Sequence, residues 1–134
     1  MGTAKSTENL SKSPSNNRTV GKDGEALART FLKSKGFRIT EENYRCPFGE
    51  IDIIALDGGE VVFIEVKSRR TTAFGNPEES VNQKKMRKLS QVALHYLSDR
   101  GLQDREARFD VVAVLIEPGG SRIHHIPRAF DLSP

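Results

Sequence analysis

The fold is decided by residues 49–67, which read GEIDIIALDGGEVVFIEVK. Two runs rich in β-branched and other apolar residues, 50–55 and 60–67, flank Asp57-Gly58-Gly59, and this combination predicts a β-hairpin. Side chains alternate between the two faces of a strand, so the charged residues of each run fall at defined places on the hairpin. The stretch therefore predicts both the start of a sheet and the location of its acids.

The turn of this hairpin sets the distance between two acids. A Gly58-Gly59 loop puts Asp52 directly opposite Glu65. An Asp57-Gly58 loop makes Glu65 the diagonal neighbour of Asp52 on the same face. Both turns predict that the two carboxylates share a face, whereas a three-residue loop without a bulge would separate them.

Helices are predicted before and after the hairpin. From Val20, apolar residues recur at helical spacing, with Thr19 as the N-cap and Gly36 at the C′ position. A second helix is predicted to begin at Asn76-Pro77, because Asn is a favoured N-cap and proline suits the first helical position, and to end near Gly101.

Further strands are predicted at residues 37–40, 109–116 and 123–126, of which 109–116 is almost wholly apolar and is expected to be buried on both faces. The order is helix, three strands, helix, two strands. This order predicts an α/β fold with a mixed central sheet flanked by helices.

The composition bounds the class of protein. A chain of 134 residues supports a single domain, assigned to residues 19–134, and residues 1–18 are too polar to pack and are predicted to be a disordered tail. There is no apolar run of about 20 residues, no signal-peptide pattern, and only one cysteine, Cys46. These features predict a cytoplasmic protein with no membrane partner.

The basic residues are unevenly distributed. The chain has 21 Lys and Arg against 18 Asp and Glu, a net charge of +3, yet the stretch from Lys67 to Lys88 is strongly basic. Such a patch indicates either a surface that meets polyanions or a solvated helix face. The residues predicted to contact nucleic-acid phosphates are Arg69, Arg70, Gln83, Lys84, Lys85, Arg87 and Lys88.

Two acids at the end of a buried-looking strand pair require a compensating cation, because like charges on one sheet face repel. Lys67 meets that need as a structural ion pair. The alternative is Mg²⁺ or Mn²⁺ held by Asp52, Glu65 and a main-chain carbonyl, since these ions prefer oxygen ligands. With Lys67 adjacent, the set has the parts of a metal-dependent phosphodiester hydrolase.

Several motifs together resemble the YraN-type bacterial family, a branch of the restriction-endonuclease-like PD-(D/E)xK superfamily that is similar to archaeal Holliday junction resolvases. The resemblance runs from about Val20 to Phe130. The segments that carry it are Gly24-Glu25, Gly49 to Ala55, Val62 to Lys67 with Arg69, Phe74-Gly75, Lys84, and Arg108 to Val112. The sequence departs from the superfamily name in one respect, because Ile51 stands where a proline would precede Asp52.

The resemblance implies a restriction-endonuclease-like αβββαβ core in which Asp52 and Glu65 are metal ligands and Lys67 orients water or stabilises charge. Glu25 takes the place of an additional acid on the first helix, or is a solvated carboxylate at the helix start. Glu50 shares a strand face with Asp52 and is a further candidate ligand, or pairs at the start of the strand.

The function that follows is a Mg²⁺- or Mn²⁺-dependent endonuclease acting on DNA, with branched or damaged DNA among its candidate substrates. A homodimer is consistent with it, because duplex-spanning nucleases of this size usually need two active sites. The alternative is a nucleic-acid-binding module that keeps the nuclease fold but does not cleave.

Two other polar features are assigned structural roles. Asp110 lies inside an apolar strand and is predicted to form a buried ion pair with Arg108 or a helix residue. His124 and His125 are neighbours on a strand, so they are predicted to point to opposite faces and not to share a metal.

Overall fold

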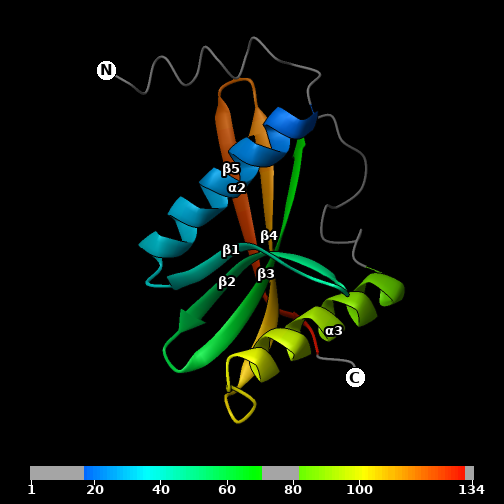
Figure 1. Cartoon of the computed structure of the whole chain (residues 1–134). Coiled ribbons are helices and arrows are strands. Elements are labelled where there is room, and N and C mark those ends of the chain that lie inside the picture. The colour runs from blue at the N-terminus through cyan, green and yellow to red at the C-terminus, as the bar shows by residue number, and fades with distance from the viewer. Residues whose placement is uncertain (1–16, 71–81, 132–134) are drawn as a thin grey trace.

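A five-stranded mixed sheet lies between two helices in the computed structural model, which describes residues 17–70 and 82–131 (Figure 1). The elements are α2 (Asn17–Ser34), β1 (Arg38–Cys46), β2 (Gly49–Asp57), β3 (Glu60–Arg70), α3 (Gln83–Asp99), β4 (Ala107–Glu117) and β5 (Gly120–Phe130). The predicted α/β class and the αβββαβ order, with one further strand, are confirmed.

The strands lie in the sheet in the order β1-β2-β3-β4-β5. β1, β2 and β3 form an antiparallel meander, β4 runs parallel to β3, and β5 is antiparallel to β4. The parallel pair requires a long connection, and α3 provides the helix of that crossover.

The β2–β3 hairpin adopts the first of the two predicted turns. Asp57 pairs with Glu60, so Gly58 and Gly59 form the loop. Gly58 has a φ of 64°, a left-handed conformation that glycine adopts without steric cost. Regular pairing then runs back along the hairpin as far as Ile53 and Ile64.

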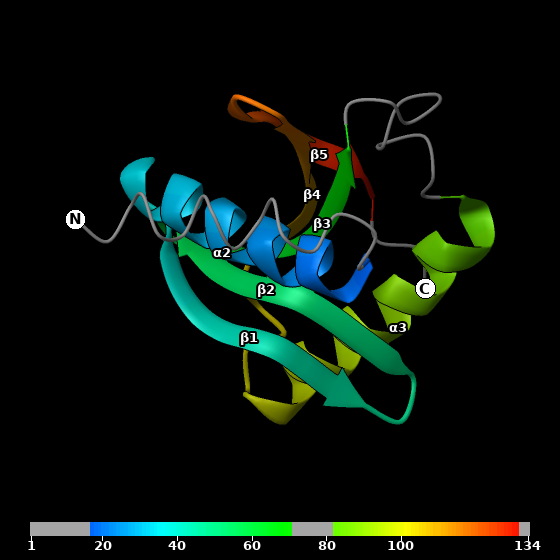
Figure 2. The same cartoon turned by 90° about the horizontal axis from the view of Figure 1, so that it is seen from above.

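Each face of the sheet carries its own apolar core, because α2 covers one face and α3 the other (Figures 1 and 2). Ala28 and Leu32 of α2 pack against residues of β2, β3 and β4 that include Ile53, Ile64 and Val112. On the other face, α3 supplies Leu89, Val92, Ala93, Tyr96 and Leu97 against Ile51, Ile54, Val61, Phe63 and Phe109. The central strands are therefore buried on both sides, as predicted for 109–116.

Several boundaries differ from the sequence prediction. α2 already includes Asn17 and Arg18, which were assigned to the tail, while residues 1–16 lie outside the described residues. The helix predicted from Asn76-Pro77 begins instead at Gln83, because Asn82 is extended and its side chain caps the first turn, and Asn76-Pro77 lies outside the described residues.

β1 and β5 are longer than predicted, since their pairing with β2 and β4 extends to Cys46 in β1 and over Gly120 to Phe130 in β5. Neither helix of the described ranges is long and apolar enough to cross a membrane.

Candidate active site

A cleft of about 860 Å³ opens where α2, β2, β3 and α3 approach one another. Both acidic and basic side chains line this cleft. The acids are Glu25, Glu50, Asp52 and Glu65, and the bases are Arg69, Lys84, Lys85 and Lys88. Residues far apart in the chain, from the N-terminal half of α2 to the N-terminal half of α3, therefore meet at one place.

Asp52 lies where β2 and β3 separate. Beyond the Ile53–Ile64 pair, the main-chain N–H of Val66 donates to Oδ2 of Asp52 at 2.8 Å. The carboxylate accepts the hydrogen bond that a main-chain carbonyl accepts in a regular strand pair. This hydrogen bond holds the side chain of Asp52 against β3. Burial and the nearby charge of Glu65 raise the pKa of Asp52 to about 7, although the Val66 N–H opposes this change.

Glu65 is buried and contacts two lysines through one oxygen atom. Its Oε2 lies 2.8 Å from Nζ of Lys85 and 3.2 Å from Nζ of Lys67. Lys67 belongs to the same strand, whereas Lys85 comes from the first turn of α3. The two ammonium groups offset the negative charge that Asp52 and Glu65 bring into the cleft.

The two lysines differ in how firmly they hold their protons. Burial lowers the pKa of Lys67, and the neighbouring Lys85 lowers it further. Burial also lowers the pKa of Lys85, but hydrogen bonds with Glu65 and Lys67 outweigh this effect and leave its pKa above the ordinary value. Lys67 is therefore the lysine that gives up a proton more readily.

Glu25 reaches the cleft from α2. Gly24 permits the close approach, because a Cβ atom there would overlap the hydroxyl group of Ser68 on β3. Burial and the charge of Glu50 raise the pKa of Glu25. Glu50 also lines the cleft, but its carboxylate is paired with Arg45 at 2.9 Å.

The structure brings most of the predicted site residues together. Lys67 touches Glu65, and the other predicted residues that line the cleft are Glu25, Glu50, Asp52, Arg69, Lys84, Lys85 and Lys88. Three predicted phosphate contacts are not among the lining residues: Arg70, Gln83 and Arg87. Of these, Gln83 and Arg87 are exposed on α3.

Sequence reasoning missed the contact between Lys85 and Glu65, since it assigned Lys85 only to phosphate binding. The contact exists because the helix begins at Gln83, with Oδ1 of Asn82 accepting from the main-chain N–H of Lys85 at 2.9 Å. The spacing held a signal: Lys85 precedes the core residue Leu89 by four positions, and residues i and i+4 share a helix face.

Phe48 was also missed as a functional residue. It lies in the turn between β1 and β2, lines the cleft, and is 46% exposed. The sequence predicted a turn at Pro47-Phe48-Gly49, and a large aromatic side chain in a turn is the signal that was available.

The donor set of the cleft fits an oxygen-preferring divalent cation. Asp52 and Glu65 supply hard carboxylate oxygens, and Mg²⁺ is usually bound by one or two carboxylates with water completing its coordination. Within residues 17–70 and 82–131, no group of three His, Cys, Asp or Glu side chains forms a metal site. Asp52 and Glu65 are the candidate ligands for such an ion, since the carboxylate of Glu50 is paired with Arg45.

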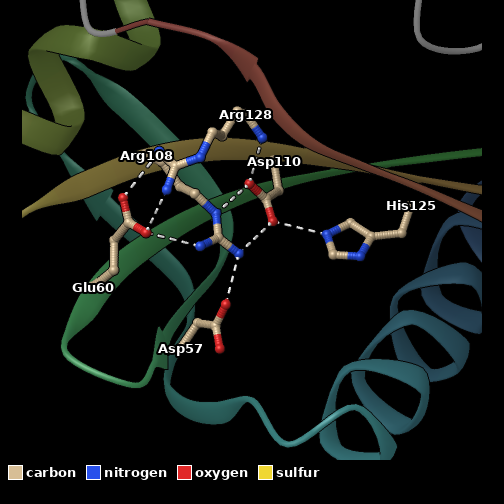
Figure 3. A network of polar contacts seen from close by, with 6 residues as sticks. All are labelled: Asp57, Glu60, Arg108, Asp110, His125 and Arg128. Atoms are coloured by element: carbon tan, nitrogen blue, oxygen red, sulfur yellow. Dashed lines mark hydrogen bonds and ion pairs between the residues drawn. The ribbon is translucent and has the colours of Figure 1, made fainter.

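A second polar network centres on Asp110 and Arg108, and none of its residues lines the cleft (Figure 3). Asp110 is fully buried and accepts hydrogen bonds from Nε of Arg108 at 2.9 Å and the main-chain N–H of Arg128 at 3.0 Å. Arg108 also reaches Glu60 at 2.9 Å and Asp57 at 3.0 Å. The predicted buried ion pair is confirmed.

His125 belongs to this network, with Nε2 2.8 Å from Oδ2 of Asp110. His124 is exposed, so the two histidines point to different sides of the strand, as predicted. Burial raises the pKa of Asp110, but hydrogen bonds with His125, Arg108 and Arg128 outweigh burial and lower it overall. The arrangement indicates a structural role for all of these groups.

The sequence of this chain is similar to those of many known proteins. The model of the uncharacterised protein family UPF0102 matches residues 24–114, which include every acid of the cleft. A UPF0102 protein of Syntrophus aciditrophicus is 50% identical over 117 residues, covering 87% of this chain and 92% of that protein. The corresponding protein of Geotalea daltonii is 51% identical over 119 residues, covering 87% and 93%.

Proposed function

We propose that this chain, which belongs to the UPF0102 family as the YraN-type resemblance predicted, is a metal-dependent endonuclease that hydrolyses phosphodiester bonds of DNA. The observation that carries the proposal is the meeting of Asp52 and Glu65 beside a basic helix in one cleft, with Lys67 contacting Glu65. The αβββαβ core and this residue set support membership of the PD-(D/E)xK superfamily.

In this proposal, Asp52 and Glu65 hold a divalent cation. Burial and then the charge of Glu65 raise the pKa of Asp52, so a bound cation would favour the ionised form of this carboxylate. When bound there, Mg²⁺ or Mn²⁺ would polarise a phosphoryl oxygen of the substrate and lower the pKa of a bound water.

Lys67 has the position to act on the reacting groups. Its Nζ lies 3.2 Å from Oε2 of Glu65, so the ammonium group would be beside the proposed metal ligand, where it would orient the attacking water or stabilise developing charge. Glu25 and Glu50 add negative charge at the edge of the same cleft, where they would hold further water molecules in place.

In this proposal, basic side chains of the cleft bind the DNA substrate. Arg69, Lys84 and Lys88 line the cleft as cations that a phosphate backbone would meet on its way to Asp52. These contacts carry no sequence information, so the proposed enzyme selects the shape of its DNA and not its sequence.

The test combines cleavage with metal binding. Linear, flapped and four-way DNA are incubated with the full chain and Mg²⁺ or Mn²⁺, and divalent-ion binding is measured by calorimetry. Asp52→Asn is expected to lose metal binding and cleavage but to keep DNA binding. Lys67→Ala is expected to keep metal and DNA binding but to lose at least 100-fold in turnover, as is typical of a group that acts on proton transfer.

Asp99→Asn is the matched control, since Asp99 is an exposed acid at the far end of α3. If the parent chain binds no divalent ion even with DNA present, the nuclease proposal fails. The non-cleaving nucleic-acid-binding module would then be the better account.

A further inference from the structure

A second, shallower hollow of about 370 Å³ lies beside the cleft, at the tip of the β1–β2 hairpin. It shares Phe48, Gly49, Glu50 and Lys88 with the cleft, so the two spaces are adjacent. A strand that crosses the cleft would therefore pass the mouth of this hollow.

Phe48 forms an exposed aromatic wall of the hollow. Among residues 22–70 and 82–131, only Phe48 and Leu94 are large hydrophobic side chains with high exposure, at 46% and 42%. Leaving apolar surface in water forgoes stabilisation of roughly 25 cal/mol per Å². Phe48 thus presents apolar surface at the edge of both hollows.

The turn that carries Phe48 is held firmly. Cys46 pairs with Gly49 across the hairpin, and the Phe48 ring meets the ring of His95 on α3 edge-on at 5.9 Å. A Cβ atom on Gly49 would lie 3.4 Å from Val92, which shows that the turn packs directly against α3. The aromatic ring is therefore fixed at the edge of the cleft.

The remaining walls are complementary to a nucleotide. Lys88 and Arg45 are the basic residues that line the hollow. Glu50 forms an ion pair with Arg45, and Lys88 is the cation that would meet a phosphate. An aromatic face flanked by cations is the arrangement with which proteins bind single-stranded nucleic acid, because the base stacks on the ring while its phosphates meet the cations.

We propose that Phe48 and this hollow bind one unpaired nucleobase of a DNA strand whose backbone lies in the adjacent cleft. The inference rests on the proposed function and narrows its substrate class to DNA with an unpaired base near the scissile bond, such as a single strand, a flap or a branch. Bases inside an intact duplex are stacked and paired, so they reach Phe48 only at the additional cost of unstacking.

The experiment compares one oligonucleotide as a single strand and as a duplex, without divalent ions, using fluorescence anisotropy and the full chain. Phe48→Ala should weaken single-strand binding about fivefold or more and change duplex binding less than twofold. Phe48→Trp should retain single-strand binding, because it keeps a stacking surface. Leu94→Ala is the matched control, since Leu94 is equally exposed but lines neither hollow, and it should change nothing.

A single strand carrying 2-aminopurine gives a direct readout of stacking. Its fluorescence should be quenched by the parent and by Phe48→Trp, but not by Phe48→Ala. Equal losses on both DNA forms, no quenching by the parent, or self-association that Phe48→Ala abolishes would overturn the inference. If the parent binds neither form of DNA, the proposed function itself fails at the binding step.

Discussion

Lys85 and Glu65 are joined by a 2.8 Å ion pair that links the first turn of α3 to β3. The ammonium group of Lys85 contacts Oε2 of Glu65, the same carboxylate oxygen that Lys67 contacts. A cation supplied by the chain therefore lies beside a carboxylate that is proposed to hold Mg²⁺ or Mn²⁺. If the proposal holds, the ammonium group and the divalent ion would compete for the same negative charge.

Replacing Lys85 by Met should strengthen Mn²⁺ binding about three- to tenfold, because it removes a positive charge beside the proposed site and keeps most of the apolar stem. Calorimetric titration of the full chain without DNA measures this change. Lys88→Met is the control, since Lys88 lines the cleft without touching Glu65 in the described contacts. Equal affinities for the parent and both variants would show that Lys85 does not compete with the ion.

Asp52→Asn should become more stable than the parent as the pH rises. The folded pKa of Asp52, about 7, lies above its ordinary value of 3.8, so the folded state binds a proton that the unfolded state has lost. The stability from this proton is fully present below pH 3.8 and is lost as the pH rises through about 7. Near pH 4 the parent and the variant should have equal free energies of unfolding. At pH 8 the free energy of unfolding of the variant should be higher by roughly 1–3 kcal/mol.

Urea unfolding at the two pH values, with a chelator present, measures that difference. Asp99→Asn shows whether any change is specific to the cleft, because Asp99 is exposed. A variant that is less stable than the parent at pH 8 would mean that the ionised Asp52 is favourable in the fold.

Asp110→Ala should lower the free energy of unfolding by about 3–5 kcal/mol, since it removes the buried carboxylate that Arg108 and His125 both contact. Because the folded pKa of Asp110 is lowered, its contribution is present above pH 3.8 and is lost as the pH falls below that value. Denaturant unfolding measures the loss. Glu117→Ala, which breaks the exposed pair with Arg122, should cost at most about 1 kcal/mol.

Reversing two charges on α3, Lys84→Glu with Arg87→Glu, should weaken DNA binding across sequences and flatten its salt dependence. Each lost phosphate contact should reduce the slope of log K against log salt by about 0.9 on duplex DNA. The control is Lys33→Glu with Lys35→Glu, which makes the same charge change in the last turn of α2 and just beyond its end, on the other side of the sheet. If both pairs of substitutions weaken binding equally, net charge and not the α3 face is responsible.

The hairpin illustrates how far the sequence alone leads. Alternation placed Asp52 and Glu65 on one face with either turn, and the pairing of Asp57 with Glu60 selects the Gly58-Gly59 loop, but regular pairing ends at Ile53 and Ile64, before it reaches the two acids. The start of the second helix was predicted from Asn76-Pro77, but Asn82 is the residue that caps α3. Both asparagines satisfy the local rule for a cap, so the sequence could not distinguish them.

By itself, the sequence determined the order of helices and strands and the sharing of a face by the two acids, because both follow from local periodicity and turn chemistry. The tertiary structure alone decided that Lys85, Glu25 and Phe48 meet around those acids. Their approach depends on the separation of β2 and β3 beyond Ile53, on the contact of Gly24 with Ser68, and on the packing of α3 against the sheet. These contacts join residues far apart in the chain, and no local pattern records where such residues will lie.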